Sequence, residues 1–356
     1  MRFFGRAVFG PSGWIARPAS HRPQQTGNRP LTFESLEGRE MLSASSISLP
    51  SMFPSATVVT VGPLISGASS VTLTTLGTVN NVQILEAVNH STSDVQLLAS
   101  TSTGTTLLHD FGIGTTSLAA LGTLSNSLVF EAVNSRTGDT QVWGTTGTAA
   151  GTTLLHDFNF GIEGAGLTTL GTVDNTLIFE VVNSRTGDTQ VWGTTGTTAG
   201  TALLHDFNFG IQRASLTVLG TVNNRFIFEA ANSITGDVQV WGTTGTSAGT
   251  ALLRDFNFGI SRAELTVLAT VNNTLVFEAV NSVTGDTQVW GTTGTNAGTT
   301  LLHDFNYGIG GAYLSVQSVA SGELYFEVTV VSTGETQLWK TNGTASGTVL
   351  VGEFRT

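Results

Sequence analysis

The side chains best suited to chemistry in this 356-residue chain are carboxylates that return at fixed intervals. After residue 45, 18 of the 22 acidic residues occupy three positions of a repeated unit. The first position lies inside an apolar run and holds Glu86, Glu131, Glu180, Glu229, Glu278 and Glu327. The second is a turn position, which holds Asp139 and its equivalents. The third lies at the end of a Leu-rich run and holds Asp157 and its equivalents.

Turn acids and run-end acids form a candidate cation site. If the GTTGTxAGT segment is a tight turn, Asp139 lies opposite Asp157 on the neighbouring strand. Like charges placed opposite each other destabilise a sheet, so a bridging cation with a preference for oxygen ligands, such as Ca²⁺, would explain the recurrence. The alternative is that both are solvated turn acids that keep the surface soluble. The candidate ligands, taken as pairs, are Asp139 and Asp157, Asp188 and Asp206, Asp237 and Asp255, Asp286 and Asp304, and Glu335 and Glu353.

The first set of carboxylates is expected to point between layers, where an unpaired charge is costly. A basic residue also recurs once per unit, as His109, His156, His205, Arg254 and His303. We therefore expect a structural layer of Glu–His or Glu–Arg pairs. The competing interpretation is catalytic, because perturbed pairs of this kind mark active sites as well as ion networks.

The positions just described belong to a 49-residue unit built from short strands. Its clearest segment reads QVWGTTGTAAGTTLLHDF at Gln141–Phe158, and it places Trp143, Trp192, Trp241, Trp290 and Trp339 at intervals of 49 residues. Within one unit LTTLGTV, TLIFEVV, TQVWG and TALLHDF read as four strands separated by turn signals. Four strands every 40–50 residues are typical of a β-propeller blade, and the tryptophans are expected in the core. The sequence predicts an all-β, six-bladed β-propeller with four-stranded blades over residues 67–356.

The composition excludes several classes of function. There is no cysteine, so disulfides and thiolate chemistry are excluded. After residue 45 the chain has eight basic and 22 acidic residues, a net charge of −14, which makes nucleic acid a poor partner. No apolar run is long enough for a transmembrane helix. No recognised catalytic motif is present, so we expect no enzyme and no cofactor other than the Ca²⁺ considered above.

The repeat resembles the ELWxxDGTxxGTxLvkD repeats of bacterial surface and secreted proteins. The resemblance covers about 290 residues and rests on the Trp, the Gly-Thr pairs and the Leu-rich strand. It implies a propeller-like fold and a location at the cell surface, and it implies no reaction. Two positions depart from the family. Gln replaces Glu before the aromatic strand residue, and Thr or, at Asn342, Asn replaces the Asp of DGT.

The head of the chain has a different composition. Residues 1–45 carry six arginines and read as a disordered or processed leader. Within it, RPLTFESLEGREMLSA at 29–44 resembles the LEPR-xLL motif of exported planctomycete proteins, with Gly38 where the family has Pro and Met41 where it usually has Leu. The resemblance implies export. Residues 46–66 read as a linker with a strand at Thr57–Val61, which aligns with a fourth strand and could close the ring beside the last blade.

A specific ligand is expected where the blades differ. Arg213 and Arg262 occupy matching loop positions on adjacent blades and could hold an anionic glycan. Tyr307 and Tyr313, both in the last repeat, could stack on a sugar. We therefore predict an exported, non-enzymatic binding or structural module whose partner is a surface glycan or protein. The alternatives are a carbohydrate-active hydrolase or lyase that uses propeller carboxylates, and a Ca²⁺-dependent adhesion domain.

Overall fold

The computed structural model describes residues 71–113, 115–160, 164–207, 214–232, 234–256, 263–307 and 311–354. The chain divides into two compact units, Met1–Ser45 and Ser46–Thr356, and all described residues belong to the second. The predicted leader, its export-type motif and the Thr57–Val61 strand lie outside the described residues.

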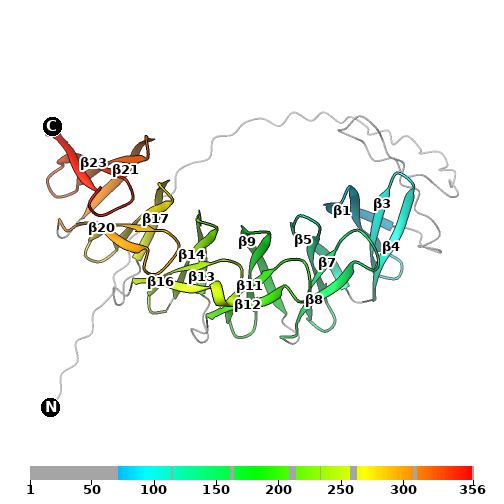
Figure 1. Cartoon of the computed structure of the whole chain (residues 1–356). Coiled ribbons are helices and arrows are strands. Elements are labelled where there is room, and N and C mark those ends of the chain that lie inside the picture. Colours follow the sequence, from blue (N-terminus) through cyan, green and yellow to red (C-terminus); the bar gives the residue numbers. More distant parts are fainter. Residues whose placement is uncertain are drawn as a thin grey trace, which may run out of the picture. The chain divides into compact units, whose positions relative to one another are not determined.

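Six four-stranded antiparallel sheets follow one another along the chain (Figure 1). In each sheet the strands lie side by side in chain order, and we number the sheets one to six. Sheets one and two comprise β1 (Val71–Val79), β2 (Val82–Asn89), β3 (Asp94–Thr101), β4 (Gly104–Ile113), β5 (Thr115–Thr123), β6 (Leu128–Asn134), β7 (Thr140–Thr145) and β8 (Thr152–Phe158). Sheets three and four comprise β9 (Ala165–Val173), β10 (Thr176–Asn183), β11 (Thr189–Thr194), β12 (Thr201–Phe207), β13 (Ala214–Val222), β14 (Arg225–Asn232), β15 (Val238–Thr243) and β16 (Ala251–Phe256). Sheets five and six comprise β17 (Ala263–Val271), β18 (Thr274–Asn281), β19 (Thr287–Thr292), β20 (Thr299–Phe305), β21 (Ala312–Ala320), β22 (Glu323–Val330), β23 (Thr336–Thr341) and β24 (Val349–Phe354).

The first hairpin of most sheets is set by a two-residue turn. Asp174 and Asn175 both have positive φ angles, 47° and 57°. Aspartate and asparagine tolerate this left-handed region better than most residues, and such turns match the twist of paired strands. The turn predicted between LTTLGTV and TLIFEVV is therefore confirmed.

Sheets two to five bury apolar residues on both faces. One face of sheet three, which we call its Trp face, carries Phe179, Val181 and Trp192 and packs on sheet two. The opposite face, which we call the Glu face, carries Ile178 and Phe207 and packs on sheet four. The same two faces exist in the other sheets, because the residues recur every 49 positions from sheet two onward and at a slightly shorter interval between sheets one and two. A strand that is buried on both sides reads as a nearly continuous apolar run, as TLIFEVV does.

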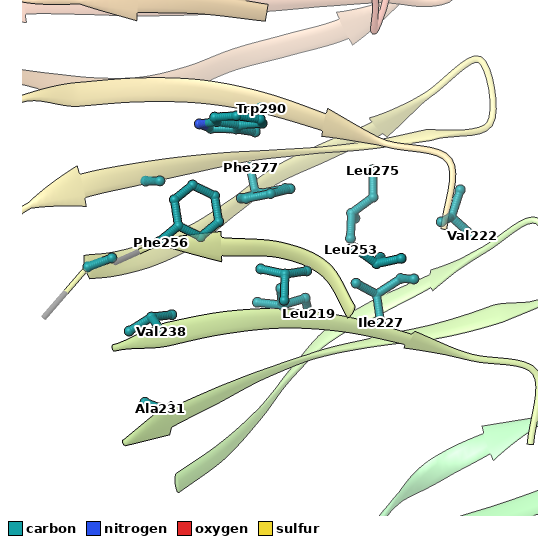
Figure 2. Packing of buried hydrophobic residues seen from close by; sticks show 13 residues of the cluster. Leu219, Val222, Ile227, Ala231, Val238, Leu253, Phe256, Leu275, Phe277 and Trp290 are labelled. Atoms are coloured by element: carbon teal, nitrogen blue, oxygen red, sulfur yellow. The ribbon is translucent and has the colours of Figure 1, made fainter. Parts of the chain in front are cut away.

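Five apolar clusters join consecutive sheets, from sheets one and two to sheets five and six. Figure 2 shows the cluster between sheets four and five, where Phe256 points toward Phe277 and Trp290 of the next sheet. The ring centroids of Phe256 and Trp290 are 5.4 Å apart and nearly perpendicular, an edge-to-face geometry that aromatic pairs favour. The core of this protein therefore lies between the sheets.

Hydrogen bonds and close backbone contacts also join neighbouring sheets. The Asn223 side-chain amide donates to the carbonyl oxygens of Asn273 and Thr293 in the next sheet, at 2.9 and 3.2 Å. Gly245, with a φ of +86°, lies so close to Thr176 of the preceding sheet that a Cβ would come within 2.8 Å of it. The recurring spacing of GTTGT thus serves the contact between sheets as well as the turn.

The architecture is a six-bladed, propeller-like all-β fold, as the sequence predicted. The repeat accounts for all six sheets, and each sheet is one blade of four strands in up-and-down order.

Candidate functional site

The fourth-strand acids do not lie opposite the turn acids. In sheet two, Asp157 is paired with Gln141, so the expected register of Asp139 with Asp157 is wrong by two residues. Leu155 forms a bulge, because Val142 pairs with His156 whereas Trp143 pairs with Leu154, and this bulge shifts the register by one residue. The turn itself shifts the register by the other residue, since Thr145 pairs with Thr152. The same register recurs in sheets three to six.

The fourth-strand acids accept a hydrogen bond from a glutamine, which itself accepts a hydrogen bond from the tryptophan. Gln141 donates from Nε2 to Asp157 Oδ2 at 2.9 Å and accepts at Oε1 from the indole Nε1 of Trp143 at 3.0 Å. Only an amide can donate and accept in this way, because a glutamate could not donate to the aspartate. The relay therefore requires an amide at this position. The relay recurs as Gln190 with Asp206 and Trp192, Gln239 with Asp255 and Trp241, and Gln288 with Asp304 and Trp290.

The turn acids bind within their own hairpins. Asp139 accepts from the Thr137 hydroxyl at 2.7 Å, and Asp188 and Asp237 accept from the equivalent threonines at 2.8 Å. In sheet five the turn acid Asp286 and the fourth-strand acid Asp304 share a side-chain hydrogen bond. Burial and this neighbouring carboxylate raise the pKa of Asp286. Within the described part of the chain, no group of three His, Asp or Glu side chains is arranged to hold a metal ion.

The mid-strand glutamates face the next sheet. Glu86 accepts from the backbone N–H of Leu118, on the first strand of sheet two, at 2.7 Å. Burial raises the pKa of Glu131, and burial together with Glu264 raises that of Glu278 to about 7. These carboxylates are therefore hydrogen-bond acceptors or partly protonated groups in the contact between sheets.

The recurring basic residues stack on the tryptophan of the next sheet. The ring centroids of His205 and Trp241 are 4.0 Å apart, and those of His156 and Trp192 are 4.3 Å apart. Arg254 takes the same place, with its guanidinium carbon 4.4 Å from the Trp290 ring, a cation–π distance. Burial lowers the pKa of the histidines His109, His156, His205 and His303 below their usual value.

The expected Glu–His pairing takes a different form. Glu180 and His205 lie in one cross-strand row on the Glu face, but Val191 stands between them in the register. The row places both polar side chains at the contact with sheet four. The histidine contact with an aromatic ring of the next sheet was not predicted, although the recurrence of both residues at one interval was visible in the sequence.

The five repeated tryptophans are packed between sheets, as predicted. Trp192, Trp241 and Trp290 are buried, and Trp143 and Trp339 pack at the edges of their clusters. Their faces are covered by His or Arg and by phenylalanines, so they do not form open stacking platforms for a sugar.

The candidate ligand residues have different surroundings. Tyr307 is half-buried, stacks on Phe305 and donates from its hydroxyl to Gln337 Oε1 at 2.9 Å. Tyr313, on β21, is 71% exposed. Arg213 and Arg262 lie outside the described residues, so their predicted pairing stays a prediction.

A pocket of about 310 Å³ lies between sheets three and four. It is lined by Gly166, Thr168, Glu180, Val182, Ala214, Ser215 and Leu216. The volume is at the lower end of the range for small-molecule sites, and Glu180 supplies its single ionisable group.

Comparisons with known proteins add nothing to the assignment of a site. No protein-family model and no curated protein matches the sequence. Among solved structures, Sqt1 of Saccharomyces cerevisiae is similar over 80% of this chain and 77% of its own, with 14% identity and a TM-score of 0.34. Oligopeptidase B from Leishmania major is similar over 80% of this chain with 10% identity and a TM-score of 0.38, and the chain spans 41% of its length. Likeness at this level carries no argument about activity. Among the described residues, no helix is long and apolar enough to cross a membrane.

Proposed function

We propose that this chain is an exported, non-enzymatic module of the cell surface that binds a glycan or a protein. The observation that carries the proposal is the use of the recurring reactive side chains. The fourth-strand acids orient glutamines, the histidines cover tryptophans, and Glu86 accepts from the backbone of the next sheet. Groups that perform the same packing task in several sheets are not set apart for one active site.

Export is supported by the sequence alone. The 29–44 segment resembles a planctomycete export motif, and the repeat resembles those of bacterial surface proteins. A cysteine-free chain with a net charge of −14 after residue 45 is consistent with such a location. Fractionation of the native host with an antibody to residues 71–354 tests this part, and a chain found only in the cytoplasm would contradict it.

Binding is best sought where one sheet differs from the others. Tyr313 exposes its ring on β21, at the position held by Ser215 in sheet four and Glu264 in sheet five. An exposed tyrosine offers a flat apolar ring and a hydroxyl, the combination that sugars and protein partners both use. We therefore assign Tyr313 as the first residue to test for ligand contact.

The experiment is a glycan array probed with the full chain, followed by titration calorimetry of any hit. Tyr313→Ser, which copies sheet four, is expected to weaken binding roughly two- to tenfold, since an aromatic contact is worth roughly 0.5–1.5 kcal/mol. Val283→Ser is the matched control, because Val283 is similarly exposed on another hairpin. Incubation with acidic polysaccharides tests the enzyme alternative. Product release that is abolished by Glu278→Gln alone would contradict the proposal.

A further inference from the structure

The pocket between sheets three and four lies where a recurring position has no side chain. Gly166 on β9 is paired with Val182, and Thr168 with Glu180, so all four residues belong to the Glu face of sheet three. A Cβ added to Gly166 would meet no heavy atom within 4 Å apart from its chain neighbours, so the space above it is open. The equivalents of Gly166 in the other sheets all carry side chains, as Thr72, Ser117, Ser215, Glu264 and Tyr313.

The missing side chain leaves the carboxylate of Glu180 accessible. In sheet five the equivalent position holds Glu264, whose charge helps to raise the pKa of Glu278. A side chain at this position therefore lies close enough to the mid-strand glutamate of its own sheet to act on it. Glu229 and Glu278 are 4% and 8% exposed, whereas Glu180 is half-buried and lines the pocket.

The other walls of the pocket supply hydroxyl, backbone and apolar groups. Thr168 is exposed and lies directly across from Glu180, so the two side chains are neighbours on one face. The opposite wall is Ala214–Leu216 of β13, the edge strand of sheet four. An edge strand has backbone N–H and C=O groups that its own sheet does not use, and Glu86 accepts from such an N–H of sheet two. Val182 gives the pocket an apolar side.

We propose that this pocket binds an amino sugar with a free amine. The carboxylate of Glu180 accepts from the ammonium group, in a charge-assisted pair that is stronger than a neutral hydrogen bond. A carboxylate has about four acceptor positions, so a backbone partner of the kind that Glu86 has leaves room for the ammonium. Thr168 and the edge of β13 bind ring hydroxyls, and Val182 packs on the C–H face of the ring. The volume of about 310 Å³ suits one small ring.

The charge of the chain favours a cationic ligand over an anionic one. None of the described residues that line the pocket is basic. After residue 45 the chain has eight basic and 22 acidic residues, and an excess of negative charge raises the local concentration of cations.

Among the described sheets, only sheet three combines these features. Sheet two has Ala119 in place of Thr168, and the mid-strand glutamates of sheets one, four and five are buried. In sheet six the position of Gly166 holds Tyr313. The pocket is therefore a site of its own, and its assignment does not rest on the ligand contact proposed for Tyr313.

The test is a titration of the full chain with D-glucosamine, followed by nuclear magnetic resonance. We expect the dissociation constant of glucosamine to be at least about tenfold lower than that of N-acetyl-D-glucosamine, which keeps the ring and loses the charge. Glu180→Gln is expected to weaken glucosamine binding at least about tenfold, because it removes the carboxylate charge. Gly166→Tyr, which copies sheet six, is expected to abolish binding by filling the pocket. The φ angle of Gly166 lies outside the left-handed region, so the backbone accepts a side chain there.

Two substitutions in sheet two are matched controls. Glu131→Gln and Ser117→Tyr make the same changes at the equivalent positions. Each is expected to change the dissociation constant by less than about twofold, because the altered site lies in another contact between sheets. Hydrogen exchange at Thr189–Thr194 verifies that sheet three stays folded in Gly166→Tyr, and a chain that loses this protection is judged on Glu180→Gln alone.

Absence of glucosamine binding would overturn the proposal, and so would equal binding of glucosamine and N-acetylglucosamine. Equal weakening by Glu131→Gln and Glu180→Gln would also overturn it, because the ligand would then not be bound in this pocket. Binding of Nα-acetyllysine as tight as that of glucosamine would show that the ammonium alone is recognised, and the assignment to a sugar would be rejected.

Discussion

The exposed and buried members of one phenylalanine series provide a matched test of stacking between sheets. Phe207 lies between sheets three and four, with its ring centroid 6.2 Å from that of Phe228 and 5.4 Å from that of Trp241. Phe354 holds the same position in sheet six, where no described sheet covers it. Phe207→Ala and Phe354→Ala therefore delete the same side chain from equivalent strands in two environments.

We expect Phe207→Ala to lower the free energy of unfolding by about 3–5 kcal/mol. The cost combines the lost burial of the ring, the cavity that remains and the two edge-to-face contacts. We expect Phe354→Ala to cost less than about 1 kcal/mol, since most of its ring already contacts solvent.

Equilibrium unfolding in urea, followed by tryptophan fluorescence and by far-ultraviolet circular dichroism, measures both changes. Two optical signals are needed because repeat arrays can unfold in steps. Equal destabilisation by the two substitutions would refute the reasoning, because it would mean that the neighbouring sheet contributes nothing to the burial of this position.

Three further predictions follow from the contacts between sheets. His205→Arg, which copies Arg254, is expected to change the unfolding free energy by less than about 1 kcal/mol, and His205→Asp to cost clearly more in the same urea assay. Trp192→Ala is expected to cost about 3–5 kcal/mol, and an unchanged thermal melt would show that the indole is not buried. The pKa of Glu278 is raised to about 7, so the folded state favours its protonated form and loses stability as the pH rises through 7. Glu278→Gln should therefore stabilise the chain by roughly 1–3 kcal/mol at pH 8, a value reduced for solvent screening, and by little at pH 4, and a gain independent of pH would contradict this.

The repeat made the fold predictable, because six copies of one pattern reinforce each weak local signal. Alternation and turn residues located the strands, and the 49-residue interval placed the five repeated tryptophans between sheets. The positive φ angles of Asp174 and Asn175 follow from residue type. These features depend on local backbone chemistry or on burial, which a single sequence carries directly.

The side-chain partners were harder to predict. The fourth-strand bulge at Leu155 moves Asp157 away from Asp139 and places it beside Gln141. No residue type in the repeat indicates that the strand has a bulge at this position. The stacking of His205 on Trp241 depends on which face of one sheet meets the next. That relation is decided by packing between repeats, so periodicity within one repeat cannot reveal it.

The Gln two residues before each repeated tryptophan shows what the sequence could have revealed. An amide beside a buried indole and an aspartate suggests a donor–acceptor relay once all three are placed on one face. Gln141, Trp143 and Asp157 do share a face, and their hydrogen bonds of 2.9 and 3.0 Å give the recurring glutamine its physical reason.

Native-state hydrogen exchange on the full chain tests most directly whether each sheet is stabilised by the neighbour that covers it. Sheets three to five are covered on both faces by neighbouring sheets, and their third strands are Thr189–Thr194, Val238–Thr243 and Thr287–Thr292. The equivalent strand of sheet six, Thr336–Thr341, belongs to the sheet with an exposed Glu face. We predict slow and similar exchange in the first three strands and faster exchange in the fourth. Equal protection of all four strands would contradict the account.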